Sequence, residues 1–410
     1  MSEPTTAVAP AYDEQAVLAP ALERGEPGWL LERRAEAARA FAALPLPTPA
    51  LRPWRYTDVT RLDLSAFAPA ETPIAIEGTV DEGGAYAGTL AGALEDRGRL
   101  VADRLGALIP ATEGKFVAAN AALWSGGALV HAPAGHAFEE PVVVTIDAGE
   151  FADAALYPRL LIEADEQSEV TVVLRTRSGD APLLASGVVE ITVAQAARVR
   201  LLIDDRWGAA TQDFTTIRAR LGRDADLQVA SLAIGGAILK QTVEVVLEGE
   251  GANSSIRAVA LGDGDQHFDF VTLQDHVGPR TISDVEVKAA LAGASRSIYY
   301  GITRVEEGAA GSEANQQNRN LLLSGDSKAD SDPVLEILTA DVIRCGHAAT
   351  VGPVDQDALF YLQSRGLDRR TALQLLVSGF FQTVARDLAV GGMADDLERT
   401  VFAKLAQAVL

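Results

Sequence analysis

The chain has 410 residues, enough for two to three average domains or for one long repetitive domain. Its 35 basic and 57 acidic residues give a formal net charge of −22, which argues against nucleic acid and anionic membranes as partners. The composition, 48% hydrophobic and 22% charged, is typical of a folded protein. Because the N-terminus carries no basic stretch followed by an apolar run, we expect a soluble, cytoplasmic protein.

The first part of the chain, residues 1–124, is predicted to be helical and mixed. Residues 1–12 are rich in Ala, Pro and Thr, and we expect a disordered tail there. Apolar residues then recur at helical spacing up to Phe41, and the prolines from Pro45 onward stop the pattern, which predicts two helices. The connector that follows contains PWRYTDV, whose Trp54 and Tyr56 are expected to pack it onto the body.

Residues 125–352 alternate between apolar and polar positions, which is typical of β-strands. A unit of strand, polar corner and strand recurs. Residues 243–256 and 285–298 align without a gap at an offset of 42. Repeats spaced by about 26 to 42 residues favour a solenoid, and a parallel β-helix is the leading candidate. A large antiparallel sandwich remains the alternative, although the scarcity of Asn-Gly and Asp-Gly turns argues against tight hairpins.

The helical period returns after residue 352, so residues 353–410 are predicted to form a C-terminal helical domain. Asp355 or Asp357 can cap a short helix that ends before Gly366, and Asp368 can cap a longer one. A further helix is expected from Ala394 to the end. The longer helix carries an apolar stripe of Leu373, Leu376, Val377, Phe380, Phe381, Val384 and Leu388.

Most of the histidines are better explained as structural residues than as metal ligands. His131 and His136 lie in a corner rich in Gly and Pro, where histidine is usually a surface or turn residue. His267 and Asp269 share one face of a predicted strand and could hold a metal together. With only two ligands nearby, a polar outer face is the favoured interpretation.

Cys345 and His347 are the strongest candidates for chemistry. Cys345 is the only cysteine, which excludes an intramolecular disulfide and a four-thiolate cluster held by this chain alone. If the segment is extended, the two side chains point to the same face, with Gly346 between them leaving room for close approach. Judged on residue types alone, a buried thiol and a hydrogen-bonded histidine remain the favoured alternative.

Several segments resemble the SufB/SufD family of iron–sulfur cluster assembly proteins. They are PWRYTDV, NQQNRNLLLSGDSKADSDPVLEI (315–337), DVIRCGHAATVG (341–352) and LFYLQSRGL (359–367). The resemblance implies a mainly β fold, a right-handed parallel β-helix flanked by N-terminal and C-terminal helical domains. The C-G-H arrangement, the length and the single cysteine resemble the SufD branch more than the SufB branch.

The resemblance implies a scaffold subunit without enzymatic activity that pairs with SufB through the ends of their β-helices. It also implies that an ABC-type ATPase, SufC, docks on the C-terminal helices and hydrolyses ATP, while this chain binds no nucleotide. His347, and with it Cys345, would contribute to iron or to a transient iron–sulfur cluster between the chains. The residues that the resemblance suggests for SufC docking are Leu359, Phe360, Tyr361, Arg365, Phe380 and Phe381.

Two other functions are compatible with parts of the sequence. The chain could be a SufB-like scaffold, pairing with a second copy of itself, that accepts sulfur on Cys345. A β-helical carbohydrate-active enzyme would need clustered carboxylates or basic residues on one face of the solenoid, and no such cluster is evident.

Overall fold

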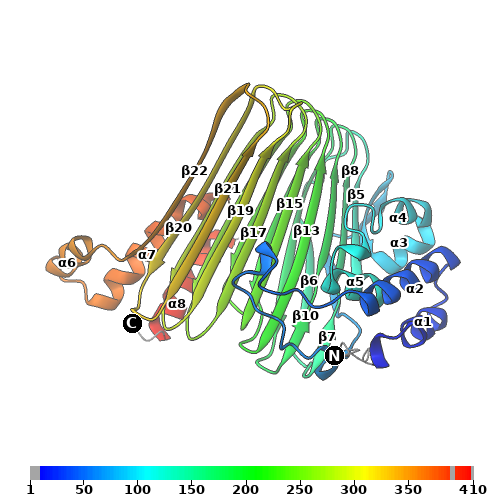
Figure 1. Ribbon diagram of the computed structural model, residues 1–410, viewed down its shortest axis with the longest axis horizontal. Helices are drawn as coiled ribbons and strands as arrows, with labels where there is room; N and C mark the ends of the chain where they lie inside the picture. The colour runs from blue at the N-terminus through cyan, green and yellow to red at the C-terminus, as the bar shows by residue number, and fades with distance from the viewer. Residues whose placement is uncertain (1–9, 388–392, 408–410) are drawn as a thin grey trace, which may run out of the picture.

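The computed structural model describes residues 10–387 and 393–407, and its body is a long two-sheet solenoid with helices at both ends (Figure 1). From β5 onward, successive long strands alternate between the two sheets, and paired strands within each sheet run parallel. The eight coils of the described chain run from β5 and β6 to β21 and β22. The predicted parallel β-helix flanked by helices is therefore confirmed, and the antiparallel sandwich is excluded.

The strand bounds define two sheets, called sheet A and sheet B below. In spatial order, sheet A contains β21 (Lys328–Ile337), β19 (Arg296–Val305), β17 (His267–His276), β15 (Ile238–Leu247), β13 (Thr211–Leu221), β11 (Val188–Val193), β8 (Arg159–Ala164), β5 (Gly127–Ala132), β4 (Ala85–Thr89) and β3 (Val80–Glu82). Sheet A also contains three short strands, β1 (Ala68–Pro69), β7 (Ala154–Leu156) and β10 (Leu183–Ala185). Strand β1 pairs with β7, β7 pairs with β10, and β10 pairs with β13. Sheet B contains β2 (Ile74–Glu77), β6 (Val142–Ala148), β9 (Glu169–Ser178), β12 (Arg198–Arg206), β14 (Asp226–Ala233), β16 (Asn253–Gly262), β18 (Ile282–Leu291), β20 (Ser312–Leu322) and β22 (Val342–Pro353).

The structural repeat is shorter than the longest spacing seen in the sequence. Cα partners in neighbouring coils lie 26 residues apart between Gln212 and Ile238, and 32 apart between Arg296 and Lys328. The offset of 42 residues instead aligns a corner that leads from sheet A to sheet B with a corner that leads back. The predicted offset of 42 is therefore wrong as a coil repeat. The two segments resemble each other because both kinds of corner favour the same small, turn-forming residues between apolar strands.

Alternate residues of each strand point into the space between the sheets, called the bore below. Val285, Val287 and Ala289 of β18 are examples, each at most 1% exposed. Burial of a Val, Leu or Ile side chain contributes roughly 1.5–3 kcal/mol, so the stacked apolar positions supply most of the stabilisation of the solenoid.

At the corners that lead from sheet A to sheet B, one residue per coil has a left-handed backbone conformation and hydrogen-bonds the corner of the next coil. Each residue at this corner position has a positive φ and donates its backbone N–H to a carbonyl in the corner of the next coil. These residues are Gly135, Gln167, Ala196, Asp224, Gly251, Arg280 and Gly311. Four of the seven are not glycine, so the bond to the next coil offsets the cost of the left-handed backbone there.

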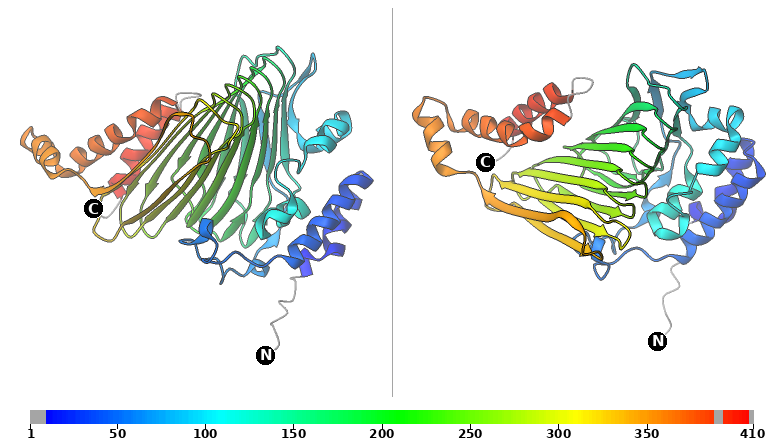
Figure 2. Two further views of the ribbon diagram at one scale, coloured as in Figure 1. Left: turned by 45° about the horizontal axis from the view of Figure 1, so that its top comes forward. Right: turned by 90° about the horizontal axis from the view of Figure 1, so that it is seen from above.

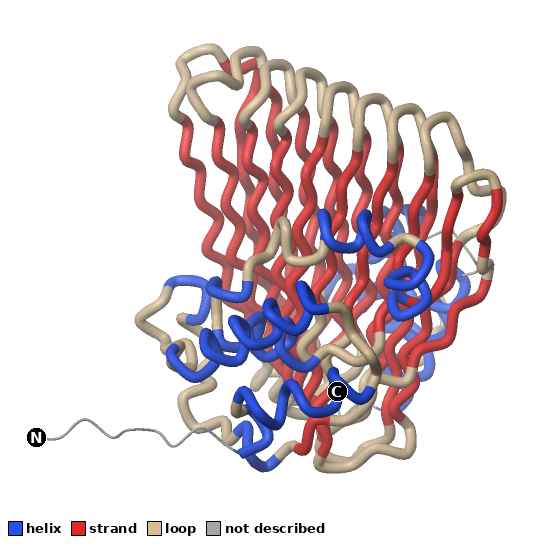
Figure 3. The backbone as a smooth tube through the Cα atoms, turned by 90° about the vertical axis from the view of Figure 1, so that its right-hand side faces the viewer, coloured by secondary structure: helices blue, strands red, loops and turns tan. Residues whose placement is uncertain are grey.

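The N-terminal helices cover the first coils of the solenoid, as Figure 3 shows from that end. They are α1 (Glu14–Glu23), α2 (Gly28–Ala43), α3 (Leu90–Asp96), α4 (Gly98–Arg104) and α5 (Lys115–Leu123). The two helices predicted from periodicity are confirmed as α1 and α2. The predicted tail is wrong at residues 10–12, which form a 3₁₀ turn whose Tyr12 is buried and stacks on Phe41 at 4.6 Å. The rest of the tail, residues 1–9, lies outside the described residues.

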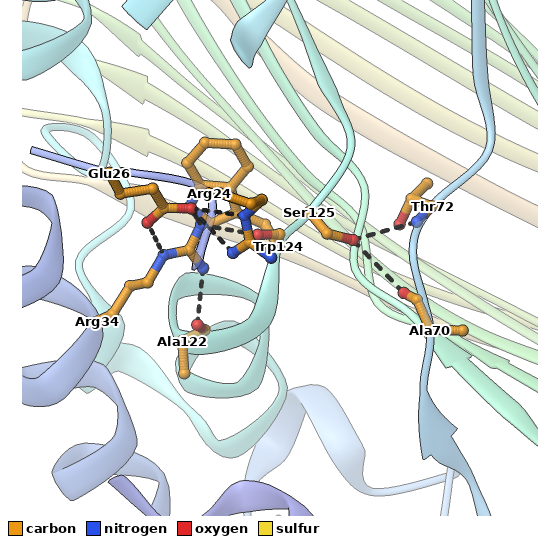
Figure 4. Close-up of polar contacts among 8 residues, drawn as sticks. All are labelled: Arg24, Glu26, Arg34, Ala70, Thr72, Ala122, Trp124 and Ser125. Carbon is orange, nitrogen blue, oxygen red and sulfur yellow. Dashed lines mark hydrogen bonds and ion pairs between the residues drawn. The ribbon is translucent and has the colours of Figure 1, made fainter. Parts of the chain in front are cut away.

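A buried arginine ties these helices to the chain that enters the first coil (Figure 4). Arg34 is 1% exposed, pairs with Glu26 at 2.5 Å and donates to the carbonyl oxygens of Ala122 and Trp124 at 2.8 and 2.9 Å. Its guanidinium carbon also lies 4.6 Å from the centroid of the Trp124 ring. The guanidinium therefore has partners that compensate its desolvation.

The PWRYTDV segment, called the strap below, crosses the outer face of sheet A. Thr57 Oγ1 hydrogen-bonds His267 Nε2 at 2.8 Å and donates to Asp269. Tyr56 Oη donates to Asp332 of the last strand of sheet A at 3.2 Å. The strap thus connects the N-terminal region with the coil at the far end of the solenoid.

The three C-terminal helices are α6 (Gln356–Ser364), α7 (Arg369–Asp387) and α8 (Met393–Gln407). Of these, α7 and α8 pack on the outer face of sheet B, and α6 projects beyond the solenoid and packs against α7 (Figure 2). Asp355 and Asp368 accept hydrogen bonds from the first backbone amides of α6 and α7, as predicted. The described residues of the predicted stripe face the body or lie partly buried, whereas Leu388 and residues 408–410 lie outside the described part. No helix among the described residues is long and apolar enough to cross a membrane.

Candidate functional site

The last coil of the solenoid is open to one side. Strands β21 and β22 are the edges of sheets A and B, and no described strand pairs with their outer sides. No residue of either strand is fully buried. Each strand therefore presents a row of backbone donors and acceptors, together with side chains that would be interior in any earlier coil.

Cys345 and His347 lie on this edge and face the open end of the bore. In the register of the sheet, Cys345 pairs with Ala314 and His347 with Gln316. Ala314 and Gln316 are each 1% exposed and point inward. Because paired residues of parallel strands project to the same side, the thiol and the imidazole share this face, as the sequence predicted.

Below the two side chains, the bore changes from apolar to polar within one coil. Val285 and Val287 of β18 are followed in register by Gln316 and Asn318 of β20. Gln316 Oε1 accepts from Tyr299 Oη at 3.0 Å, and Gln316 Nε2 donates to the carbonyl of Val334 at 3.0 Å. We call this layer, which includes Asn318 and Asn320, the amide floor. It gives the open end a hydrogen-bonded base on which polar ligands or water can rest.

The amide floor continues through a second set of contacts. Asn318 Nδ2 donates to the carbonyl of Val287 at 3.1 Å, and Asn318 Oδ1 accepts from Ser331 Oγ and from Asn320 Nδ2. Sequence reasoning missed this floor. The signal was present in NQQNRN, where amides occupy the alternate positions that hold apolar residues in the preceding coils.

Cys345 and His347 differ in their exposure to solvent. Cys345 is half-buried, and partial burial raises the pKa of its thiol, so the neutral form is favoured until a metal or base removes the proton. His347 is exposed, and a Cβ at Gly346 would meet no atom within 4 Å. In the described part of the chain, no three His, Cys, Asp or Glu residues are placed so that they could hold a metal ion together. Within the described residues, Cys345 and His347 therefore form a pair without a third residue of these types beside them.

The other four histidines are engaged within the chain. His131 Nε2 lies 3.0 Å from Asp165 Oδ2, and the His136 ring packs edge-on against Phe138. His267 and Asp269 share a face as predicted, but Thr57 of the strap covers them and hydrogen-bonds both. His276 is fully buried between the hydroxyls of Thr281 and Ser283. Each histidine thus has a structural explanation.

The residues considered for partner docking divide into two groups. Leu359 and Phe381 are buried in the contact between the C-terminal helices and sheet B, and Phe380 is partly buried there. Phe360 and Tyr361 are 72% and 56% exposed, and Arg365 stacks over the Tyr361 ring at 5.1 Å. Only the second group forms a surface, which lies on α6 directly after β22.

Residues 145–380 match the family model described as the SufBD core domain of the SUF system for FeS cluster assembly. This match covers more than half of the chain. The chain therefore belongs to the SufB/SufD family, whose members are components of iron–sulfur cluster assembly.

Individual relatives agree with this family. An iron–sulfur cluster assembly SufBD family protein of Mycobacterium tuberculosis is 31% identical over 269 residues, which cover 64% of this chain and 67% of the relative. Bacillus subtilis SufD is 28% identical over 93% of this chain and 95% of its own length. Bacillus subtilis SufB is 29% identical over 72% of this chain and 64% of its own length.

Proposed function

We propose that this chain is the SufD-type subunit of a cytoplasmic SufBCD scaffold, where it helps to acquire iron and form a nascent cluster. The similarity to SufD extends over 93% of the chain, whereas the similarity to SufB covers 72%. The single cysteine is in keeping with a chain that supplies only part of a cluster site.

The observation that carries this proposal is the open edge at β22, with Cys345 and His347 on its inner face. Large apolar side chains are exposed on the same coil, among them Leu338 at 55% and Ile343 at 72%. A partner edge, from SufB or from a second copy, would cover these side chains and satisfy the free backbone groups. The same partner would bring the ligands that Cys345 and His347 lack.

In this complex, His347 and Cys345 would act as ligands to iron or to the growing cluster. A neutral imidazole nitrogen and a thiolate are both suitable ligands for iron. Because the Cys345 thiol has a raised pKa, metal binding must displace its proton, which makes capture by Cys345 dependent on pH. His347 is more exposed and is the first contact we expect for incoming iron.

The test is reconstitution of the full chain with SufB and SufC, with iron and sulfide measured per complex. The variants are His347→Ala, Cys345→Ala and the control His136→Ala, which lies far from the edge in sequence and coil. We expect a large loss of iron with His347→Ala, a smaller loss with Cys345→Ala and none with the control. Equal metal in all complexes would refute the proposed ligand role.

We propose SufC docking at Phe360, Tyr361 and Arg365. The exposed aromatic rings lie on α6, which follows β22 after only Val354 and Asp355. Phe360→Ala with Tyr361→Ala should reduce co-purification of SufC, whereas Leu375→Ala, a 43% exposed control on α7, should not. Unchanged co-purification with the double variant would contradict docking at α6.

Docking at α6 also gives a route by which ATP binding in SufC can act on the iron site. If SufC pulls on α6, the strain reaches β22 and Cys345 through a short connection. We expect a non-hydrolysable nucleotide to change the rate of thiol labelling at Cys345 in the reconstituted complex. An unchanged rate would rule out this coupling.

The second candidate function is a SufB-like scaffold that accepts sulfur on Cys345. Persulfide acceptors work best as thiolates, and the raised pKa of Cys345 opposes this role in the isolated chain. Stoichiometric persulfide transfer to the isolated chain, lost in Cys345→Ser, would favour this alternative over the SufD-type role.

A further inference from the structure

A small cavity lies inside the bore, far in sequence from Cys345 and His347. Its volume is about 20 Å³, which is room for one species the size of a water molecule. Most of the wall is apolar, with Ile146, Leu174 and Ile203 among the lining residues. Besides Arg159, the polar lining residues are Thr176, Asp205, Asp213, Thr215 and Gln241, which come from four strands of both sheets.

Two carboxylates share this cavity without a basic partner. Asp205 and Asp213 are each 3% exposed, and no described Lys or Arg pairs with either of them. Arg159 borders the cavity, but its guanidinium is bonded to Asn120 and Glu190. Two unpaired carboxylates in an apolar core are costly to bury. Desolvation raises the pKa of both carboxyls, that of Asp213 to about 7.

The hydrogen bonds around the carboxylates hold them in place without neutralising them. Thr176 Oγ1 donates to Asp205 Oδ1 at 2.8 Å. Thr215 Oγ1 and Trp207 Nε1 donate to the two oxygens of Asp213 at 2.8 and 3.2 Å. All of these donors are uncharged, so they supply no positive charge to compensate either carboxylate when it is ionised.

Gln241 gives an independent indication of a ligand. It is 3% exposed and lines the cavity next to Thr215, its partner in the register of sheet A. Its side-chain amide makes no hydrogen bond to another described residue, although buried amides are nearly always bonded. An amide oxygen, two carboxylates and two hydroxyls form an all-oxygen set of possible donors, which suits a hard cation.

We propose that the cavity between Asp205, Asp213 and Gln241 binds a hard divalent cation of the Ca²⁺ or Mn²⁺ type, which stabilises the middle of the solenoid. The cation neutralises the two carboxylates and supplies the partner that Gln241 lacks. Mg²⁺ fits less well, because it usually retains several waters and the cavity has room for a single species. This site is independent of the edge at β22 and of the cluster chemistry proposed there.

The test uses the full chain, stripped with a chelator, in thermal unfolding with and without Ca²⁺ or Mn²⁺. The variants are Asp205→Asn and the control Asp204→Asn, whose residue lies next in the chain, is equally buried and pairs with Arg206 outside the bore. We expect either ion to raise the Tm of the native chain and of Asp204→Asn, and to leave the Tm of Asp205→Asn unchanged. Terbium luminescence excited through Trp207 should follow the same pattern.

Three results decide the question. If neither ion changes the Tm of the native chain and no sensitised terbium signal appears, the proposal is wrong, and the carboxyls share a proton beside a water molecule. If Asp205→Asn keeps the full ion-induced shift, the ion binds elsewhere and the proposal is also wrong. Should Asp205→Asn not fold, Gln241→Leu keeps both carboxylates, and its ion-induced shift must be smaller than that of the native chain.

Discussion

The two ends of the solenoid differ in the length and the direction of their edge strands. At the N-terminal end, the edges are β3 and β2, with three and four residues, each antiparallel to its neighbour. At the C-terminal end, β21 and β22 have ten and twelve residues and continue the parallel sheets. Short, reversed edges resist further pairing, whereas long, regular ones invite it.

The side chains follow the same division. Ile74, Ile76 and Val80 pack against the apolar core at the N-terminal end, and the helices around Arg34 cover the first coils. At the other end, the amide floor replaces the apolar core, and Ile343 is exposed. One end is closed within the chain, and the other end has the features of a surface that is completed by a partner.

The largest effect is expected at the closed end. Arg34→Met leaves Glu26 with only Arg24 at the surface and removes the donors to the carbonyls of Ala122 and Trp124. Breaking a buried ion pair costs about 3–5 kcal/mol, so the free energy of unfolding in urea should fall by this amount. The matched control is Arg39→Met, whose exposed pair with Glu14 should be worth less than about 1 kcal/mol. Similar losses in both variants would mean that the closed end is not held by Arg34.

The next largest effect is the loss of unfolding free energy at acid pH that comes from His276, which is buried in the bore. Desolvation lowers the pKa of His276 to about 4, below the unfolded value near 6.5. Above pH 6.5, His276 is neutral in both the folded and the unfolded chain, and the free energy of unfolding does not depend on its titration. As the pH falls from 6.5 to 4, the unfolded chain binds the proton before the folded chain does, so the free energy of unfolding decreases. The loss is about 3 kcal/mol.

His276→Gln should therefore flatten the fall in unfolding free energy across this pH range, measured by urea denaturation at each pH. The loss of the bonds to Thr281 and Ser283 lowers stability at every pH and does not change the slope. Parallel curves for the native chain and the variant would show that His276 does not titrate in this range.

A smaller effect is expected at the amide floor. Gln316→Met leaves the carbonyl of Val334 without its donor, while Tyr299 Oη keeps its bond to Thr272. The loss should be about 1–2 kcal/mol in thermal or urea unfolding. Gln317→Met, at the neighbouring outward position, is the control and should change little. A neutral or stabilising Gln316→Met would mean that the polar floor serves only ligands and not the fold.

The smallest effect on folding is expected at the open edge itself. Ile343 is 72% exposed, so Ile343→Asp should change the unfolding free energy of the single chain by less than about 0.5 kcal/mol. The same variant should prevent pairing with SufB or with a second copy, as measured by light scattering. If pairing persists, the partner does not cover β22, and the contrast between the two ends needs another explanation.

Much of the candidate site could be predicted because it depends on local periodicity. Cys345 and His347 are two positions apart in a strand, with only Gly346 between them, so their side chains lie on the same face. Which face they share could not be predicted, because the inward direction follows from the register with Ala314 and Gln316 on the neighbouring strand. The residues proposed for SufC docking show the same limit. Leu359 and Phe360 are adjacent in the sequence, yet only Phe360 is exposed once α6 packs against α7.

Composition, periodicity and capping are local properties, and they were enough to predict the helix–solenoid–helix order, the helix cap at Asp368 and the single thiol beside His347. The length of the repeat, the left-handed backbone at Ala196 and Arg280, and the burial of Asp205 and Asp213 follow only from the packing of the coils. These features depend on contacts between coils about 26 to 32 residues apart, where each coil supplies the hydrogen bonds and the surroundings of the next.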